Sequence, residues 1–183
     1  NTRAIDKLLQ YKGRREGKPL SIAVTDQKMA EKYVEINEQA LKFYKSFLPG
    51  PFTVISKSKN QTDPRVNSEF GTLGIRIPNY SLIIKIIKNL GQAITSTSAN
   101  ASGKKRPYTL QDIFNGLSEK QKSLMDLAID AGELPKNEPS IVVDTTLSTP
   151  IALRGSLQNN EGEILWSNNE NETIDLAGRL LLN

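Results

Sequence analysis

Apolar side chains recur at helical spacing in several stretches of the chain. Residues 2–11 place Ile5, Leu8 and Leu9 on one face of a helix, because side chains three and four positions apart share a helical face. The stretch 80–91 is strongly apolar and stops at Gly91, a residue suited to the cap that ends a helix. The patterns predict helices over residues 2–11, 38–47, 80–91, 109–127 with a break near Gly116, and 174–182.

Short apolar runs lie between these helical stretches. Residues 20–24 (LSIAV) form such a run directly after the Lys18-Pro19 break, which is typical of a buried strand. The alternation of helices and strands indicates an α/β or α+β domain with a twisted, mixed sheet. Strands are predicted over residues 20–24, 52–57, 71–78, 92–95, 127–132, 140–146, 150–155 and 164–166.

The composition is that of an ordinary globular domain. The chain has 183 residues, of which 37% are hydrophobic and 24% are charged, values typical of a folded protein rather than a disordered one. We therefore predict a single domain over residues 1–183. Residues 158–183, which include a segment rich in asparagine and glutamate, are predicted to form a loop and a C-terminal helix or a linker.

Net charge and residue usage limit the kinds of ligand and catalytic site that this chain can have. The formal net charge of +4 suits an anionic ligand or a weak nucleic-acid contact, and does not choose between them. The sequence has no cysteine and no histidine, which excludes disulfides, thiolate catalysis, Ser-His triads, and metal sites built from those residues. Any catalysis must use Lys, Arg, hydroxyls, carboxylates, backbone amides or an oxygen-bound ion.

No membrane-spanning pattern is present in the sequence. The most apolar helical stretch, residues 81–90, contains two lysines and is far shorter than the ~20 residues that a membrane span needs. The chain does not begin with the charged and then apolar pattern of a signal peptide. We expect a cytoplasmic protein with no membrane partner.

Two glycine-containing turns are candidate ligand loops. Residues 11–19 (YKGRREGKP) hold four basic residues around two glycines, which suits binding of phosphate or carboxylate oxygens. A solvated basic turn explains this cluster equally well. Residues 48–54 (LPGPFTV) form a rigid turn that places Thr53 at the start of a strand, and here a purely structural turn is the simpler interpretation.

Two arginines lie in predicted strands. On a two-residue alternation, Arg76 faces the same side as Gly74, and we expect that little else on this face would block a ligand. The alternative is that Arg76 is simply exposed on a strand with one face toward solvent. Arg154 lies at the end of the strand 150–155 and, by itself, is most simply a surface charge.

The stretch ITSTSANASG, residues 94–103, is dense in hydroxyl side chains. A strand end followed by small hydroxyl residues can present donors to an anion, or its side chains can simply satisfy their own backbone. The sequence contains no phosphate-loop pattern and no dinucleotide-binding pattern. A nucleotide site in this chain must therefore be of another kind.

Six short motifs occur in order along nearly the whole chain: KGR (12–14), PGPFT (49–53), GIRIP (74–78), TSAN-SG (97–103), PSIVVD (139–144) and LRG (153–155). Each is weak alone. Together and in this order they resemble the YrdC-like family, the threonylcarbamoyl-adenylate synthases.

The resemblance implies a YrdC-like twisted mixed sheet, flanked by helices around a positively charged cavity. It implies a nucleotidyltransferase that converts L-threonine, bicarbonate and ATP into threonylcarbamoyl-AMP and pyrophosphate, the first step toward N6-threonylcarbamoyladenosine at position 37 of tRNA. It also implies a tRNA-modifying transferase as partner protein or fused domain, so that tRNA is only an indirect partner. Mg²⁺ is expected with the ATP phosphates.

Matching family positions imply a role for each site residue. Lys12 and Arg14 are the expected catalytic pair, which holds the phosphates and the carbamate. Arg76 is expected to face the carboxylate of threonine, with Ser96 as the second threonine-binding residue. No side chain is expected to ligate a metal. The residues expected to bind ATP are Arg14, Thr72, Ser98, Asn100 and Arg154.

Such a site is consistent with a chain that lacks histidine. Adenylation of a carbamate requires a carboxylate, a carbamate and a triphosphate to be held together against their mutual repulsion. Fixed hydrogen-bond donors and cations, rather than a histidine base, meet that need.

The chain departs from the family pattern at its start. Family members begin with a strand and a Thr-Asp-Thr-x-Tyr-Gly-Leu-like motif, whereas this sequence starts at Asn1-Thr2-Arg3. We expect residues upstream of Asn1 to complete the sheet and the threonine pocket.

Two other functions stay open. One is the YrdC-like adenylating domain of a larger carbamoyltransferase, and the other is a non-catalytic RNA-binding module. The second is weakened by an aromatic content of only 6%, with no exposed aromatic residues interleaved with Arg or Lys.

Overall fold

A computed structural model describes residues 1–13, 19–100 and 105–155. The chain divides into two compact units. We call Asn1–Lys18 with Thr97–Glu138 the helical unit, and Pro19–Ser96 with Pro139–Asn183 the sheet unit. The predicted strand 164–166 and helix 174–182 lie outside the described residues, and the single domain over 1–183 stays a prediction.

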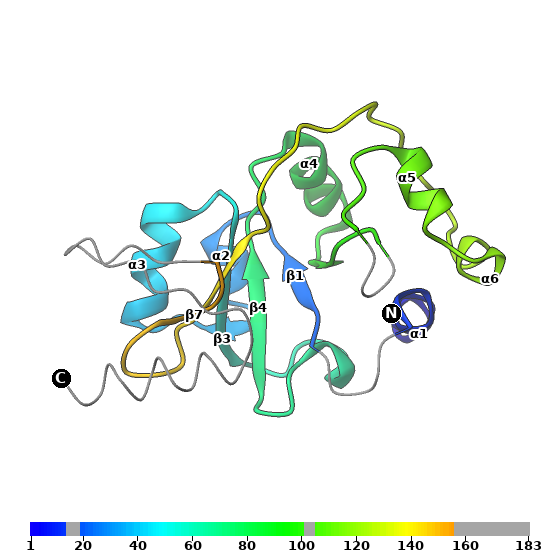
Figure 1. Cartoon of the computed structure of the whole chain (residues 1–183). Helices are drawn as coiled ribbons and strands as arrows, with labels where there is room; N and C mark the ends of the chain where they lie inside the picture. Colours follow the sequence, from blue (N-terminus) through cyan, green and yellow to red (C-terminus); the bar gives the residue numbers. More distant parts are fainter. Residues whose placement is uncertain (14–18, 101–104, 156–183) are drawn as a thin grey trace. The chain divides into compact units, whose positions relative to one another are not determined.

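The sheet unit is built on one mixed sheet (Figure 1). The strand order is β5-β1-β4-β3-β6-β7, and β2 also pairs with β3. The pairs β1–β4 and β3–β6 are parallel and the other pairs are antiparallel, which confirms the predicted mixed sheet. The strands are β1 (Ser21–Ala23), β2 (Val34–Glu35), β3 (Phe52–Ser58), β4 (Thr72–Arg76), β5 (Ile94–Ser96), β6 (Ile141–Asp144) and β7 (Ile151–Arg154).

The two faces of this sheet differ in chemistry. Side chains directly opposite in paired strands share a face, so the register places Val54, Ile75 and Val143 together on one side. All three are fully buried, and burial of each stabilises the fold by roughly 1.5–3 kcal/mol. We call this side the apolar face. The opposite, polar face carries Ser21, Thr53, Thr72, Arg76, Ser96 and Arg154.

Helix α3 (Glu38–Phe47) covers part of the apolar face, beside β3 (Figure 1). The ring of Phe52 in β3 stacks on Phe47 at 4.5 Å between centroids and also approaches Phe43. Asn37 begins α3, because its side chain accepts a hydrogen bond from the backbone N–H of Ala40. The other helices of this unit are α2 (Gln27–Ala30), the 3-10 turn η1 (Pro64–Val66) and α4 (Ser81–Leu90).

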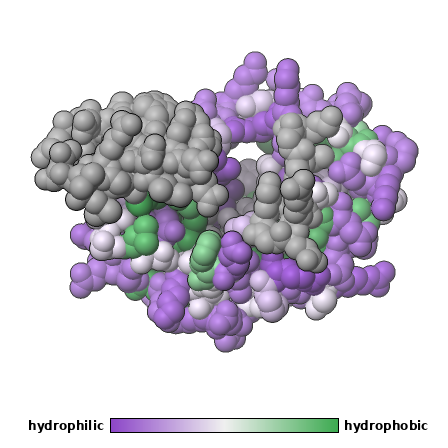
Figure 2. All heavy atoms as spheres, turned by 60° about the horizontal axis from the view of Figure 1, so that its bottom comes forward, coloured by the Kyte–Doolittle hydropathy of each residue, from purple (hydrophilic) through white to green (hydrophobic). Residues whose placement is uncertain are grey.

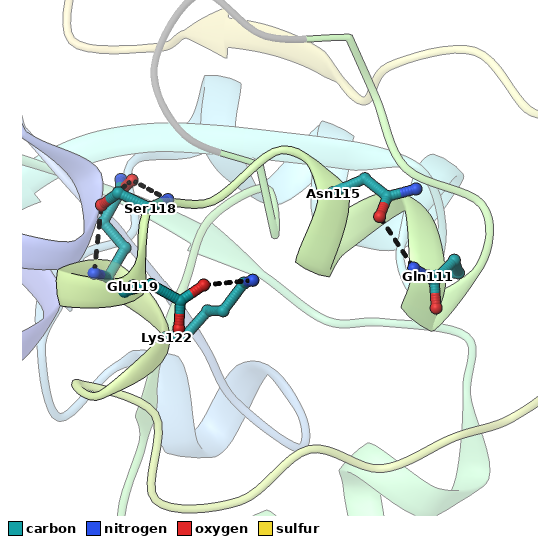
Figure 3. Close-up of polar contacts among 6 residues, drawn as sticks. Gln111, Asn115, Ser118, Glu119 and Lys122 are labelled. Carbon is teal, nitrogen blue, oxygen red and sulfur yellow. Dashed lines mark hydrogen bonds and ion pairs between the residues drawn. The ribbon is translucent and has the colours of Figure 1, made fainter.

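The helical unit contains α1 (Thr2–Lys12), α5 (Leu110–Asn115) and α6 (Glu119–Lys122). Both α5 and α6 begin at capping boxes, in which the first residue and the residue three positions on exchange hydrogen bonds. The side-chain contacts drawn in Figure 3 join Gln111 with Asn115, Ser118 with Gln121, and Glu119 with Lys122.

Most predicted elements are confirmed, and one strand is wrong. Gly91 ends α4 in the left-handed conformation, as predicted. The predicted helix 109–127 breaks at Gly116 as expected, but its second part ends at Lys122. Residues 127–132 form no strand, since no strand pairs with them; Leu127 is 80% exposed, and the carboxylate of Asp130 accepts the N–H of Gly132 in a local turn. The short elements α2, β2 and η1 were not predicted.

Among the described residues, no helix combines the length and apolarity needed to cross a membrane. On the face drawn in Figure 2, hydrophilic side chains cover most of the coloured surface, and hydrophobic ones gather in small groups between them.

Candidate functional site

Arg76 lies at the end of β4 on the polar face of the sheet. Its Nη2 donates to the hydroxyl of Ser140 at 2.7 Å, and its Nη1 lies 3.5 Å from the hydroxyl of Ser96, at the limit of a hydrogen bond. Ser96 reaches this place because Ser21 of β1 pairs with Ser96 on one side and with Gly74 on the other. The sheet thus brings together Arg76 and Ser96, the two residues predicted to bind threonine.

The guanidinium of Arg76 retains an unused donor. Its Nε is buried and has no hydrogen-bond partner among the described residues. Burial lowers the pKa of Arg76 below its ordinary value, and the positive charge of Arg154 lowers it further. A buried donor without a partner is unfavourable, so an anion bound beside Arg76 would relieve both the missing hydrogen bond and the repulsion from Arg154.

Ser140 joins the two arginines of the polar face. Its hydroxyl accepts from Arg76, and its backbone carbonyl accepts from Nε of Arg154 at 3.0 Å. Ser140 is itself buried, immediately before β6. The sequence did not identify Ser140 as a site residue, although it lies in the PSIVVD motif. The sequence feature that could have indicated Ser140 is a small hydroxyl residue between a proline and a predicted strand.

Thr72 and Gly74 lie on the same polar face of the sheet, and each was the subject of a prediction from the sequence. The hydroxyl of Thr72 lies 2.7 Å from that of Ser68, so it is engaged locally, and its contact with ATP stays a prediction. The expectation of open space beside Gly74 is wrong. A Cβ at Gly74 would come within 2.8 Å of Oγ of Ser21 and 3.0 Å of Cγ2 of Thr53, because these side chains already fill that position.

The helical unit holds the other predicted residues. Lys12 is only 3% exposed, and its Nζ donates to the carbonyl of Ser98 at 2.9 Å, to the hydroxyl of Ser98 at 3.2 Å and to the carbonyl of Asn100 at 2.5 Å. Three of the predicted residues therefore form one cluster. Ser98 is exposed and Asn100 is partly exposed, with the side-chain oxygen Oδ1 of Asn100 buried.

Several predicted features are not placed by these contacts. Arg14, the second member of the expected catalytic pair, lies outside the described residues, as do Ser102 and Gly103. The positively charged cavity also stays a prediction. Among the described residues, no group of three or more acidic side chains gathers that could hold a metal ion.

Comparison with known proteins gives consistent matches. The family model Sua5_yciO_yrdC, described as telomere recombination, matches residues 1–156. A curated relative from Methanocaldococcus jannaschii is 35% identical over 156 residues, which cover 84% of this chain and 70% of the relative. A relative from Pyrococcus abyssi named threonylcarbamoyl-AMP synthase is 31% identical over 153 residues, which cover 82% of this chain and 44% of the relative.

The fold also matches solved structures. The crystal structure of P. abyssi Sua5 complexed with L-threonine superposes with a TM-score of 0.74 and 27% identity, over 82% of this chain and 43% of that one. The predicted fold class is confirmed by this likeness. The chain spans less than half the length of both P. abyssi proteins.

Proposed function

The chain belongs to the Sua5/YciO/YrdC family, and from this premise we propose that it is a threonylcarbamoyl-AMP synthase. The reaction would take L-threonine, bicarbonate and ATP to threonylcarbamoyl-AMP and pyrophosphate. The observation that carries the proposal is the Arg76–Ser140–Ser96 cluster, in which a buried guanidinium Nε lacks a partner among the described residues.

The polar face suits an amino-acid carboxylate. Arg76 offers a planar set of donors that matches two carboxylate oxygens, and the hydroxyls of Ser96 and Ser140 fix its orientation. The repulsion between Arg76 and Arg154 would be offset by one bound negative charge. Support comes from the relative P. abyssi Sua5, whose structure was solved with L-threonine.

The segment 98–100 suits a nucleotide. It contains the exposed residue Ser98 and the partly exposed Asn100, and the ammonium group of Lys12 lies 3.2 Å from the hydroxyl of Ser98. We assign Ser98 and Asn100 to ATP and Arg14 to its phosphates, and the nucleotide contact of Arg154 stays a prediction. Fixed cations and donors favour the charge that develops on the phosphates as pyrophosphate leaves.

The chemistry needs no base of the histidine type. The amine of threonine attacks bicarbonate to form a carbamate with loss of water, and a carbamate oxygen then attacks the α-phosphorus of ATP and displaces pyrophosphate. Mg²⁺ would enter with ATP and neutralise its phosphates. The described residues offer no carboxylate cluster for it, so the phosphates would be its main ligands.

Wider roles follow from this reaction and belong to the same proposal. The product would be consumed by a tRNA-modifying transferase, either a partner protein or a fused domain, in the cytoplasm. The tRNA would meet that transferase rather than this chain.

Labelled bicarbonate tests the proposal. We expect the purified full-length protein to incorporate the label and release pyrophosphate from ATP only when L-threonine is present. Incorporation that ignores threonine would overturn the assignment. Dependence on carbamoyl phosphate would favour the carbamoyltransferase alternative, and salt-sensitive RNA binding without ATP turnover would favour the RNA-binding alternative.

A further inference from the structure

The last turn of α1 contacts every residue of the segment 98–100. Lys12 donates to Ser98 and to Asn100, and the hydroxyl of Tyr11 donates to the carbonyl of Ala99 between them. Tyr11 and Lys12 are consecutive in the helix, so their side chains leave it in different directions. Together they hold the backbone of this short segment at three successive positions.

The contacts of Lys12 leave it little capacity for a ligand. An ammonium group has three N–H donors, and three acceptors of the segment lie within 2.5 to 3.2 Å of Nζ. The side chain is 3% exposed. Lys12 would then act on ATP through its positive charge while its hydrogen bonds act on the segment 98–100, and its expected catalytic role stays a prediction.

Tyr11 is anchored from a second side. Its backbone carbonyl accepts a hydrogen bond of 2.7 Å from Nε2 of Gln121, which fastens α6 to the end of α1. Gly13 ends the helix directly afterwards in the left-handed conformation, with φ of 54°. Partial burial raises the pKa of the Tyr11 hydroxyl above its ordinary value, so this hydroxyl is protonated and able to donate at neutral pH.

We propose that Tyr11 is a positioning residue for the nucleotide: with Lys12 it holds residues 98–100 in the conformation in which Ser98 and Asn100 bind ATP. This rests on the proposed function, because it takes ATP as the ligand of the segment. A segment that is already ordered binds with less loss of conformational entropy. The hydroxyl of Tyr11 supplies one of the contacts that order it.

Removal of that single hydroxyl tests the proposal. We expect Tyr11→Phe to weaken ATP binding, measured by calorimetry on the full-length protein, by roughly fivefold, the effect of one neutral hydrogen bond. Affinity for threonine is expected to stay unchanged. Amide hydrogen exchange across residues 97–100 should become faster in the variant.

A matched control removes a hydroxyl elsewhere. Tyr80 is 49% exposed and precedes α4 in the sheet unit, and its side chain makes no capping hydrogen bond. Tyr80→Phe is expected to leave ATP affinity and exchange at 97–100 unchanged.

The outcomes separate this inference from the proposed reaction. ATP affinity of Tyr11→Phe equal to that of the wild type would overturn the positioning role, whatever the exchange rate. A weakened affinity for ATP and threonine alike would also overturn it, since that is the mark of a general structural defect. If the wild-type protein bound ATP but showed no threonine-dependent turnover, only the proposed reaction would be refuted, and the Tyr11 comparison would still be valid. A wild-type protein that binds no ATP would overturn both.

Discussion

The two clusters of site residues differ in what holds them in place. In the sheet unit, Arg76 and Ser96 take their positions from the register of β1, β4 and β5, which backbone hydrogen bonds maintain. In the helical unit, residues 98–100 lie outside any helix or strand, and the side chains of Tyr11 and Lys12 hold them to α1.

This difference predicts how each cluster responds to substitution. A strand keeps its course when one side chain is changed, because many backbone contacts support it. A short segment held by two side chains becomes less ordered when either is removed. Substitution of a strand residue such as Arg76 should therefore change ligand contacts without changing the backbone, whereas substitution of Tyr11 or Lys12 should alter both the segment 98–100 and ligand binding.

The largest effect is expected from Arg76→Ala. Loss of the charged donors should raise the KM for threonine on the order of 100-fold, because hydrogen bonds to charged groups are the strongest in such sites. The KM for ATP should change little. Arg76→Lys should recover part of the loss by keeping the charge, while Arg65→Ala, a change at a surface arginine paired with Asp63, should leave threonine KM at the wild-type value. An unchanged KM in Arg76→Ala would refute the carboxylate site.

Lys12→Met should break the other cluster. The substitution keeps much of the volume but leaves the acceptors of Ser98 and Asn100 without their donor, which destabilises by roughly 1–3 kcal/mol. We expect the KM for ATP to rise about 30-fold, from the loss of the positive charge and the displaced segment together. Thermal unfolding and ATP kinetics would measure both effects. Lys45→Met, at an exposed position of α3, is the control; an equal loss there would point to a nonspecific charge effect.

A smaller effect is expected from Ser140→Ala. The change removes one acceptor of Arg76 but leaves the Ser140 carbonyl for Arg154. Arg76 should then be less well oriented, and the KM for threonine should rise about tenfold with little change in stability. Ser148→Ala, in the loop between β6 and β7, should behave as wild type. If Ser140→Ala altered ATP kinetics only, Ser140 would not orient Arg76 toward threonine.

The smallest effect concerns Asp63, outside both clusters. Its carboxylate accepts hydrogen bonds from the side chain and backbone of Arg65, which lower its pKa to about 2. Because the folded pKa is lowered, the stabilisation is complete above the ordinary value of 3.8 and is lost as the pH falls through about 2.

Asp63→Asn should therefore lower stability at pH 6 by less than about 1 kcal/mol, as for other surface pairs. The difference from wild type should shrink as the pH falls from the ordinary value of 3.8 toward about 2, and denaturant unfolding across this range would measure it. A difference that persisted in acid would show that the ionised Asp63 carboxylate is not its source. Activity at neutral pH should not change.

Much of the fold was predictable because it depends on local patterns. The apolar runs around Ile22, Val54 and Val143 indicated strands, and Gly91 indicated the end of α4. The run at residues 127–132 shows the limit of such patterns. Its apolar residues suit a strand, but a strand needs a neighbour with free backbone groups, and no described strand pairs with it.

The candidate site was predictable to a similar degree. The residues Arg76 and Ser96 were recognised from short motifs and a family resemblance, and the sheet brings them together. Ser140 and Tyr11 were not identified as site residues, although both lie in stretches that were singled out from the sequence. Their roles depend on residues 64 and 88 positions away in the chain.

The sequence by itself determined the mixed α/β class, most strand and helix positions, and the chemistry available to a chain without histidine or cysteine. Periodicity and residue type are local properties, and they are sufficient for these conclusions. Only the tertiary structure decided that Arg76 and Arg154 share Ser140, that Ser21 and Thr53 fill the space beside Gly74, and that Lys12 directs its ammonium group to residues 98–100. Those contacts depend on strand register and on side-chain direction, which distant parts of the chain set together.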